Sequence, residues 1–233
     1  MMKKVMIPML ALICMLLLNS FMMPDVPKED IRKLDTFSGI GISVSADVYY
    51  IPGNTHEIRI EGEARDVDDL ITRVENGFLK VKYDSWRTRH SRLTIHITSS
   101  ELEAVRISGS ADFKSGEAIT SDEMDLSMSG SGSVQFEKLN AEEVSVSISG
   151  SGDIELLSGS SDELEVRISG SGKVNAETFE VDEFSAAISG SGSIRITAKE
   201  ELDAKISGSG KVYYHGSPRV NSKSSGSGKV VSL

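Results

Sequence analysis

Hydrophobic and polar residues alternate along the C-terminal half of the chain in a pattern that returns about every twenty residues. The repeated motif is apolar-Ser-Gly-Ser-Gly-x-apolar, and its regular copies lie at 128–134, 148–154, 168–174, 188–194 and 206–212. Degenerate copies flank them at 107–113 and 224–230. In one copy Val144, Val146 and Ile148 alternate with serines before the turn, and Ile154 and Leu156 alternate with acidic residues after it. A period of two indicates strands, and the longer fixed period indicates coils that stack as a solenoid.

The pattern therefore predicts an all-β fold in which residues 107–233 form a β-solenoid, or parallel β-helix, of six or seven coils. We expect each coil to contain two short strands joined by the Ser-Gly corner, with a less regular return path. Alternate side chains of the stacked coils fill one narrow core. A flexible Ser-Gly linker does not carry such alternation at a fixed period. In the last copy the residues before the corner are Val220, Ser222 and Ser224, and this more polar set predicts a cap that prevents edge pairing.

Residues 34–106 lack the period but are rich in β-forming residues, so we expect a β-rich N-terminal region there. The predicted strands are 37–44, 48–51, 57–60, 78–83 and 93–97, separated by turns such as Pro-Gly-Asn at 52–54 and Asn-Gly at 76–77. We expect a short helical turn within 66–73. The Ser-Gly-Ile-Gly sequence at 38–41 is interpreted as one more corner.

The N-terminus has the layout of an export signal. Lys3 and Lys4 precede an apolar run over 5–18, which predicts a signal peptide over 1–23. The alternative is an uncleaved anchor, because 5–23 is nineteen residues long. Either interpretation predicts export to the periplasm, the outer membrane or the cell surface, with membrane contact only through this segment.

Composition adds two constraints. Cys14, the single cysteine, lies in the leader, so we expect no disulfides in the exported part. Lys and Arg number 25 against 35 Asp and Glu, and the net charge of −10 argues against a nucleic-acid partner. Residues 24–33, with Pro24 and Pro27, are predicted to be a linker.

Three sequence features resemble a known family: Leu-Asp-Thr-Phe-Ser-Gly-Ile at 34–40, Val-Glu-Asn-Gly-Phe-Leu-Lys-Val at 74–81, and the repeated Ile-Ser-Gly-Ser-Gly corners. Together they resemble the DUF2807 family, described as a putative auto-transporter adhesin, head GIN domain, of exported Bacteroidetes proteins. The resemblance covers roughly residues 34–232. It implies an exported, right-handed β-helical structure and a role in adhesion, and it implies no catalytic residues.

Acidic pairs stand immediately before the first core residue of five copies, at 122–123, 142–143, 162–163, 182–183 and 200–201. Stacked coils would place neighbouring pairs about 5 Å apart. Such a column would form either a weak divalent-cation edge or a surface for a basic partner, or it would form a solvated corner that blocks lateral aggregation. We favour the solvated corner and therefore predict no metal site and no cofactor.

One dense basic stretch contains the only tryptophan: Trp86, Arg87, Arg89, His90 and Arg92. An aromatic ring beside guanidinium groups is suited to a sugar carboxylate, a sulfate or a phosphate. The alternative is an exposed hairpin loop that offsets the acidic body. We take this loop as the candidate binding site because loops commonly carry function.

Catalytic motifs are weak. The Gly-Lys pairs at 172–173, 210–211 and 228–229 are followed by valine where a phosphate-binding loop needs Ser or Thr, and the four histidines follow no triad or metal spacing. We therefore expect a non-enzymatic envelope or surface protein, an adhesin-like binding or structural module whose partner is a glycan or a surface protein. The alternative is a carbohydrate-active β-helix enzyme of the polysaccharide lyase or hydrolase type.

Overall fold

The computed structural model describes residues 27–84 and 89–233, and most of them lie in the strands of one sheet. The strands are β1 (Pro27–Lys33), β2 (Gly39–Ile42), β3 (Ala46–Pro52), β4 (Glu57–Glu63), β5 (Leu70–Glu75), β6 (Phe78–Tyr83), β7 (Leu93–Ser99), β8 (Ala104–Gly109), β9 (Asp112–Gly130), β10 (Ser133–Gly150), β11 (Asp153–Leu156), β12 (Gly159–Gly170), β13 (Lys173–Gly190), β14 (Ser193–Gly208), β15 (Lys211–His215), β16 (Arg219–Gly226) and β17 (Lys229–Ser232). A short helix, α2 (Ala64–Asp68), lies between β4 and β5.

The predicted signal peptide, 1–23, lies outside the described residues. In the parts of the chain that the structure describes, no helix is long and apolar enough to cross a membrane.

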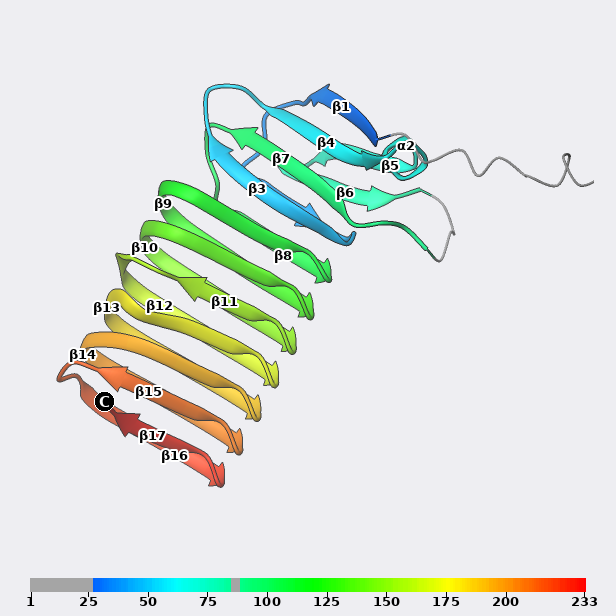
Figure 1. Ribbon diagram of the computed structural model, residues 1–233. Coiled ribbons are helices and arrows are strands. Elements are labelled where there is room, and N and C mark those ends of the chain that lie inside the picture. Colours follow the sequence, from blue (N-terminus) through cyan, green and yellow to red (C-terminus); the bar gives the residue numbers. More distant parts are fainter. Residues whose placement is uncertain (1–26, 85–88) are drawn as a thin grey trace, which may run out of the picture.

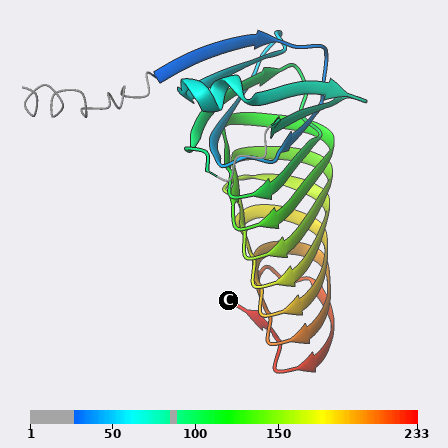
Figure 2. The same cartoon turned by 90° about the vertical axis from the view of Figure 1, so that its right-hand side faces the viewer.

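Strands β8 to β17 coil around one axis and form a solenoid of about six turns (Figures 1 and 2). Their pairing is parallel, and it joins equivalent residues of successive repeats: Ile148 pairs with Met128 on one side and with Ile168 on the other. Val144, Val146 and Ile148 are each at most 2% exposed, whereas the serines between them face outward. The all-β solenoid predicted from the repeat is confirmed.

The return path is more regular than the sequence predicted. In most coils the strand that follows the Ser-Gly corner continues without a break into the strand that precedes the next one, as β10 and β13 show. The strand bends midway, where the register between β9 and β10 shifts after Phe136. Leu139 and Phe179 fill the core at these bends, outside the alternating positions that the motif identified. Each such coil is therefore one long bent strand closed by a corner.

The corners require glycine for two different reasons. Gly170 has a φ of +129°, and a Cβ built on it would lie 2.3 Å from the carbonyl oxygen of Gly150 in the preceding coil. Gly172 lies against the core, since a Cβ there would lie 2.6 Å from Cγ2 of Ile148. The backbone N–H of Ser171 donates to the carbonyl oxygen of Gly150 at 2.9 Å. Backbone groups thus join successive corners, and the close approach leaves no room for a side chain.

The N-terminal region continues the same stack. β2 pairs in parallel with β8, and β3 pairs in parallel with β9, so that Ile42 lies beside Ile107 and Asp47 beside Asp112. This register places the corner of the first coil at 43–45. The corner predicted at 38–41 is wrong, because its two glycines lie in or at the start of β2. One hydrophobic core runs from Phe37 to Val212, across the predicted boundary at 106–107.

The first coil is covered by a cap in which β4 pairs antiparallel with β7 and with β1 (Figure 2). The linker predicted over 24–33 is wrong for Pro27–Lys33, which pair with β4 along their whole length. The Arg32 guanidinium anchors β1 by donating to the carbonyl oxygens of Leu70 at 2.6 Å and Val67 at 3.1 Å. Hydrogen bonds rather than apolar burial hold β1, so hydrophobic patterning gave no indication of it.

The segment predicted as a helical turn, 66–73, is divided between two elements. α2 ends at Asp68, and β5 begins at Leu70. β5 and β6 form an antiparallel hairpin whose turn is the predicted Asn-Gly pair, with φ of +53° at Asn76 and +76° at Gly77. Positive φ at both turn residues is the geometry that this pair favours.

The opposite end of the solenoid is polar, as the last repeat predicted. Ser222 and Ser224 pair with Ala204 and Ile206 of the preceding coil, and every residue of β16 is exposed. The apolar core thus ends one coil before the backbone does.

Replacing Gly170 with alanine tests the corner geometry. We expect Gly170→Ala to lower the free energy of unfolding by about 2 kcal/mol or more, because it combines an unfavourable φ with a backbone clash. Gly116→Ala is the matched control: Gly116 lies in β9 without a positive φ, and a Cβ there meets nothing within 4 Å. The control should be neutral or stabilise by up to about 1 kcal/mol. Equal urea-denaturation curves for both variants would contradict the packing described.

Candidate functional site

The candidate binding loop connects β6 to β7 beside the cap. Trp86 and Arg87 lie outside the described residues, and Arg89 is exposed. The proposed pairing of the tryptophan ring with arginines therefore stays a prediction. The remaining two candidates, His90 and Arg92, both make internal contacts.

His90 packs into the cap rather than facing solvent. Its Nε2 lies 3.0 Å from Oδ2 of Asp69, and both side chains are 11% exposed. Its ring stacks on that of Tyr83, with centroids 3.6 Å apart and planes within 9°. These contacts fix the C-terminal end of the loop on β6 and on the residue after α2.

Arg92 joins the cap to the solenoid. Its guanidinium forms ion pairs with Asp47, at 2.8 Å, and Asp112, which occupy equivalent positions in the first two coils. It also donates to the carbonyl oxygens of Ala46 and Ser110 at about 3 Å. The hydrogen bond with Arg92 lowers the pKa of Asp47, and the same bond raises the pKa of Arg92. Arg92 is thus a structural clamp on the corner side of these coils.

Beneath the loop lie two buried polar groups with incomplete hydrogen bonding. Asp66 is 0% exposed; its Oδ2 accepts the backbone N–H of Ser91 at 2.9 Å, and its Oδ1 has no hydrogen-bond partner among the described residues. The Tyr83 hydroxyl is also buried and makes no hydrogen bond within 27–84 and 89–233. Burial, together with the charges of Asp66 and Asp69, raises the pKa of Tyr83 to about 12.

The acidic column forms along one side of the solenoid. Parallel register aligns one glutamate from each pair, namely Glu123, Glu143, Glu163, Glu183 and Glu201. The row ends at Arg219 of the last coil, which donates to Glu201 at 2.7 Å. Across 27–84 and 89–233, no group of three or more His, Cys, Asp or Glu side chains has an arrangement that could hold a metal ion.

A second charged surface was not identified from the sequence. Lys205 pairs in register with Lys223, and Lys211 pairs with Lys229, so that two lysine pairs flank the Ser-Gly corners of the last two coils. We call these four residues the lysine corner. In the sequence, the Gly-Lys pairs that include Lys211 and Lys229 were compared only with a phosphate-binding loop. Comparing the same repeat position in successive copies would have found the lysines.

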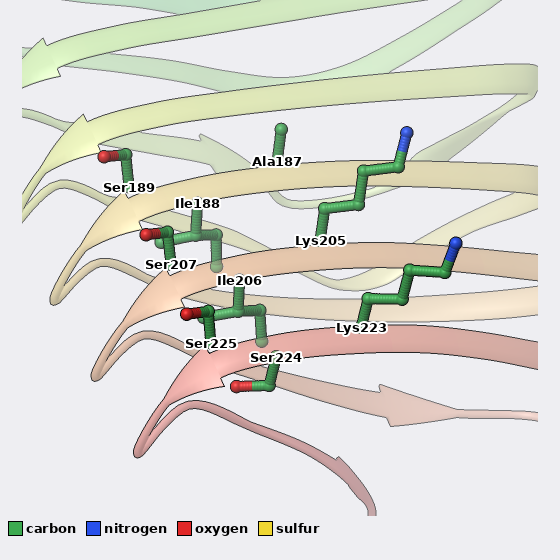
Figure 3. Close-up of a pocket in the computed structure, with 9 residues that line it drawn as sticks. All are labelled: Ala187, Ile188, Ser189, Lys205, Ile206, Ser207, Lys223, Ser224 and Ser225. Atoms are coloured by element: carbon green, nitrogen blue, oxygen red, sulfur yellow. The ribbon is translucent and has the colours of Figure 1, made fainter.

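A surface hollow of about 380 Å³ opens beside the lysine corner (Figure 3). Lys205 and Lys223 extend side by side from neighbouring strands, and Ser207 and Ser225 point to the corner side of the same face. Ala187 occupies the equivalent position one coil earlier, and its methyl group leaves the space next to the Lys205 stem open. The hollow therefore combines ammonium groups, hydroxyl groups and apolar stems.

The sequence matches the family model described as "Putative auto-transporter adhesin, head GIN domain" (DUF2807) over residues 36–218. No curated protein matches the chain.

Solved structures share the whole architecture. A putative adhesin from Bacteroides fragilis aligns with a TM-score of 0.84 at 23% identity, covering 89% of this chain and 97% of that one. A putative lipid binding protein from Parabacteroides distasonis aligns with a TM-score of 0.73 at 25% identity, covering 89% and 96%. A putative adhesin from Parabacteroides merdae gives a TM-score of 0.72 at 23% identity over the same shares. At these identities the likeness establishes the fold.

Tyr83→Phe should remove a buried hydroxyl to which the described part of the chain gives no hydrogen bond. We expect it to leave the free energy of unfolding at pH 7 unchanged or to raise it by about 1 kcal/mol. The pKa of Tyr83 is higher in the folded state than in the unfolded state, so deprotonation favours unfolding. The stability that depends on a neutral phenol is complete below about pH 10 and is lost as the pH rises through about 12. The wild type should therefore lose more stability than the variant between about pH 9 and about pH 11. Urea-denaturation curves recorded at these pH values would contradict this expectation if the two proteins lost the same free energy of unfolding.

The acidic column should respond to ionic strength alone. Like charges about 5 Å apart lie within the Debye length of about 8 Å, so salt should raise the melting temperature. Calcium chloride and sodium chloride at matched ionic strength should raise it equally. Glu143→Gln with Glu163→Gln should reduce the salt response. An excess stabilisation by calcium that these substitutions abolish would instead identify a cation site.

Proposed function

Since the chain belongs to the DUF2807 family, described as a putative auto-transporter adhesin, head GIN domain, we propose that it is a non-enzymatic exported protein of the envelope or cell surface. In this proposal it acts as an adhesin-like binding module that contacts its partner through the outside of the solenoid. The Lys3 and Lys4 leader pattern supports export.

The observation behind the proposal is the alignment of outward side chains into straight columns. Parallel pairing repeats each outward position once per coil, as in the row of glutamates from Glu123 to Glu201. A rigid, elongated surface with repeated polar groups suits a repetitive partner such as a glycan or a surface protein. Carboxylates spread over five coils are less suited to a reaction centre, which gathers its acids around one reacting bond.

Binding to the outside is also favoured by the filled interior. Phe113, Phe136, Phe179 and Phe184 are each at most 1% exposed and occupy the core in β9, β10 and β13. One structural neighbour is named a putative lipid binding protein. In this chain the space between the sheet walls is taken by side chains, so the surface is the better candidate for any ligand.

A glycan array combined with a turnover assay tests the proposal. The full chain is applied to neutral, sulfated and uronic-acid glycans and to extracts of surface proteins. The same preparation is incubated with acidic polysaccharides, and released products are measured. We expect saturable binding without product. Product formation that depends on protein concentration would overturn the non-enzymatic role, and failure to bind either partner class would overturn the binding role.

A further inference from the structure

We propose that the lysine corner (Lys205, Lys211, Lys223 and Lys229) binds the carboxylate or sulfate groups of an acidic polysaccharide. The inference rests on the proposed function as a binding module and names its ligand class and its site. It does not involve the loop at 86–92.

At the C-terminal end of the solenoid, the lysine corner brings together four lysines that form no ion pair with any described residue. From 204 to the C-terminus the sequence contains no Asp or Glu. Other basic residues of the last coils are paired: Arg195 and His215 with Glu177, and Arg219 with Glu201. Within the described chain, none of the four lysines forms an ion pair. An anion from outside the chain would therefore meet free ammonium groups.

The earlier coils provide an internal comparison. The two positions that flank each corner carry Ser127 and Ser133, Ser147 and Asp153, Arg167 and Lys173, and Ala187 and Ser193. Of these, only the coil with Arg167 and Lys173 has two basic residues, and Arg167 is paired with Glu165 on its own strand. The frame is the same in every coil, so the charge at the last two corners follows from side-chain choice and not from the fold.

The geometry suits repeated anionic groups. Neighbouring coils lie about 4.8 Å apart, so the ammonium groups of Lys205 and Lys223 can both donate to one carboxylate or sulfate. Lys211 and Lys229 provide a second such pair across the corner. Ser207 and Ser225 lie between the two pairs and offer hydroxyl groups to sugar hydroxyls.

The hollow in Figure 3 adds room for a sugar ring. Its volume of about 380 Å³ falls within the usual range of small-molecule sites. A neighbouring hollow, which Lys205 and Lys223 also line, contains the carboxylates of Asp203 and Glu165. In Figure 3 the ammonium ends of the two lysines point away from Ser207 and Ser225, toward the open surface beside the corner.

An acidic polysaccharide fits this surface better than a membrane does. The exposed large apolar residues of the described chain are Ile31, Tyr49, Ile51, Val220 and Leu233, and none of them belongs to the Ser-Gly corners. A peripheral membrane site normally combines basic groups with apolar side chains that enter the lipid. Serine hydroxyls flanked by lysines match a polymer of hydroxyl and acid groups instead.

Titration calorimetry with the full chain tests the site, using polygalacturonate and dextran sulfate as probes and neutral dextran as the blank. The variant carries Lys205→Gln, Lys211→Gln, Lys223→Gln and Lys229→Gln. The control carries Lys82→Gln, Lys114→Gln, Lys138→Gln and Lys173→Gln, which removes the same charge elsewhere. We expect the first variant to weaken binding of at least one acidic probe by about ten-fold or more and the control by less than about two-fold. Melting temperatures establish that both variants fold.

The possible outcomes separate this inference from the proposed function. Equal weakening in both variants would reduce the effect to net charge and overturn the site. Binding to vesicles with anionic lipid, but to neither polymer, would overturn the polysaccharide in favour of a membrane. Binding of a neutral glycan or a surface protein that the four substitutions leave unchanged would overturn the lysine corner and leave the binding role intact.

Discussion

Parallel backbone pairing between equivalent residues of successive coils is the interaction on which the rest of the structure depends. It places Ile148 between Met128 and Ile168, and the same register holds for the outward positions before each corner. The core is narrow because each coil contributes only its inward residues, and the surface is striped because each outward residue lies on its counterpart. Glycine at the corners is a consequence, since the backbones approach too closely there for a Cβ.

Much of the fold was predictable because the same physical requirement recurs in every coil. Alternation and the Ser-Gly motif identified the strands, the core residues near the corners and the polar end. The bends were not predicted, because Leu139 and Phe179 fill the core where the strand changes direction and the alternation breaks. β1 was not predicted for another reason. Arg32 anchors it by donating to carbonyl oxygens of the cap, and such long-range hydrogen bonds leave no local pattern in the sequence.

The candidate site shows the limit of composition as a guide to function. His90 and Arg92 belong to a basic, aromatic stretch, yet the structure uses one to pack on Tyr83 and the other to clamp Asp47 and Asp112. A residue type suited to a ligand is equally suited to an internal partner. The lysines at the far end differ from these two residues, because none of the four forms an ion pair within the described chain. The difference depends on which residues the fold brings together, and the sequence order does not reveal it.

The corner geometry also separates positions that can change from positions that cannot. Gly170 cannot change, because the carbonyl oxygen of Gly150 leaves no room for a side chain. By contrast, the outward residue three positions before the corresponding glycine differs from coil to coil: it is Ser147, Arg167, Ala187, Lys205 and Lys223 in successive coils. Each coil thus provides a surface position that can be exchanged without disturbing its neighbours. Duplication of one repeat would lengthen the molecule by about 4.8 Å and add one new surface residue to each column. Such a protein can acquire new binding preferences by point substitution while its scaffold stays constant.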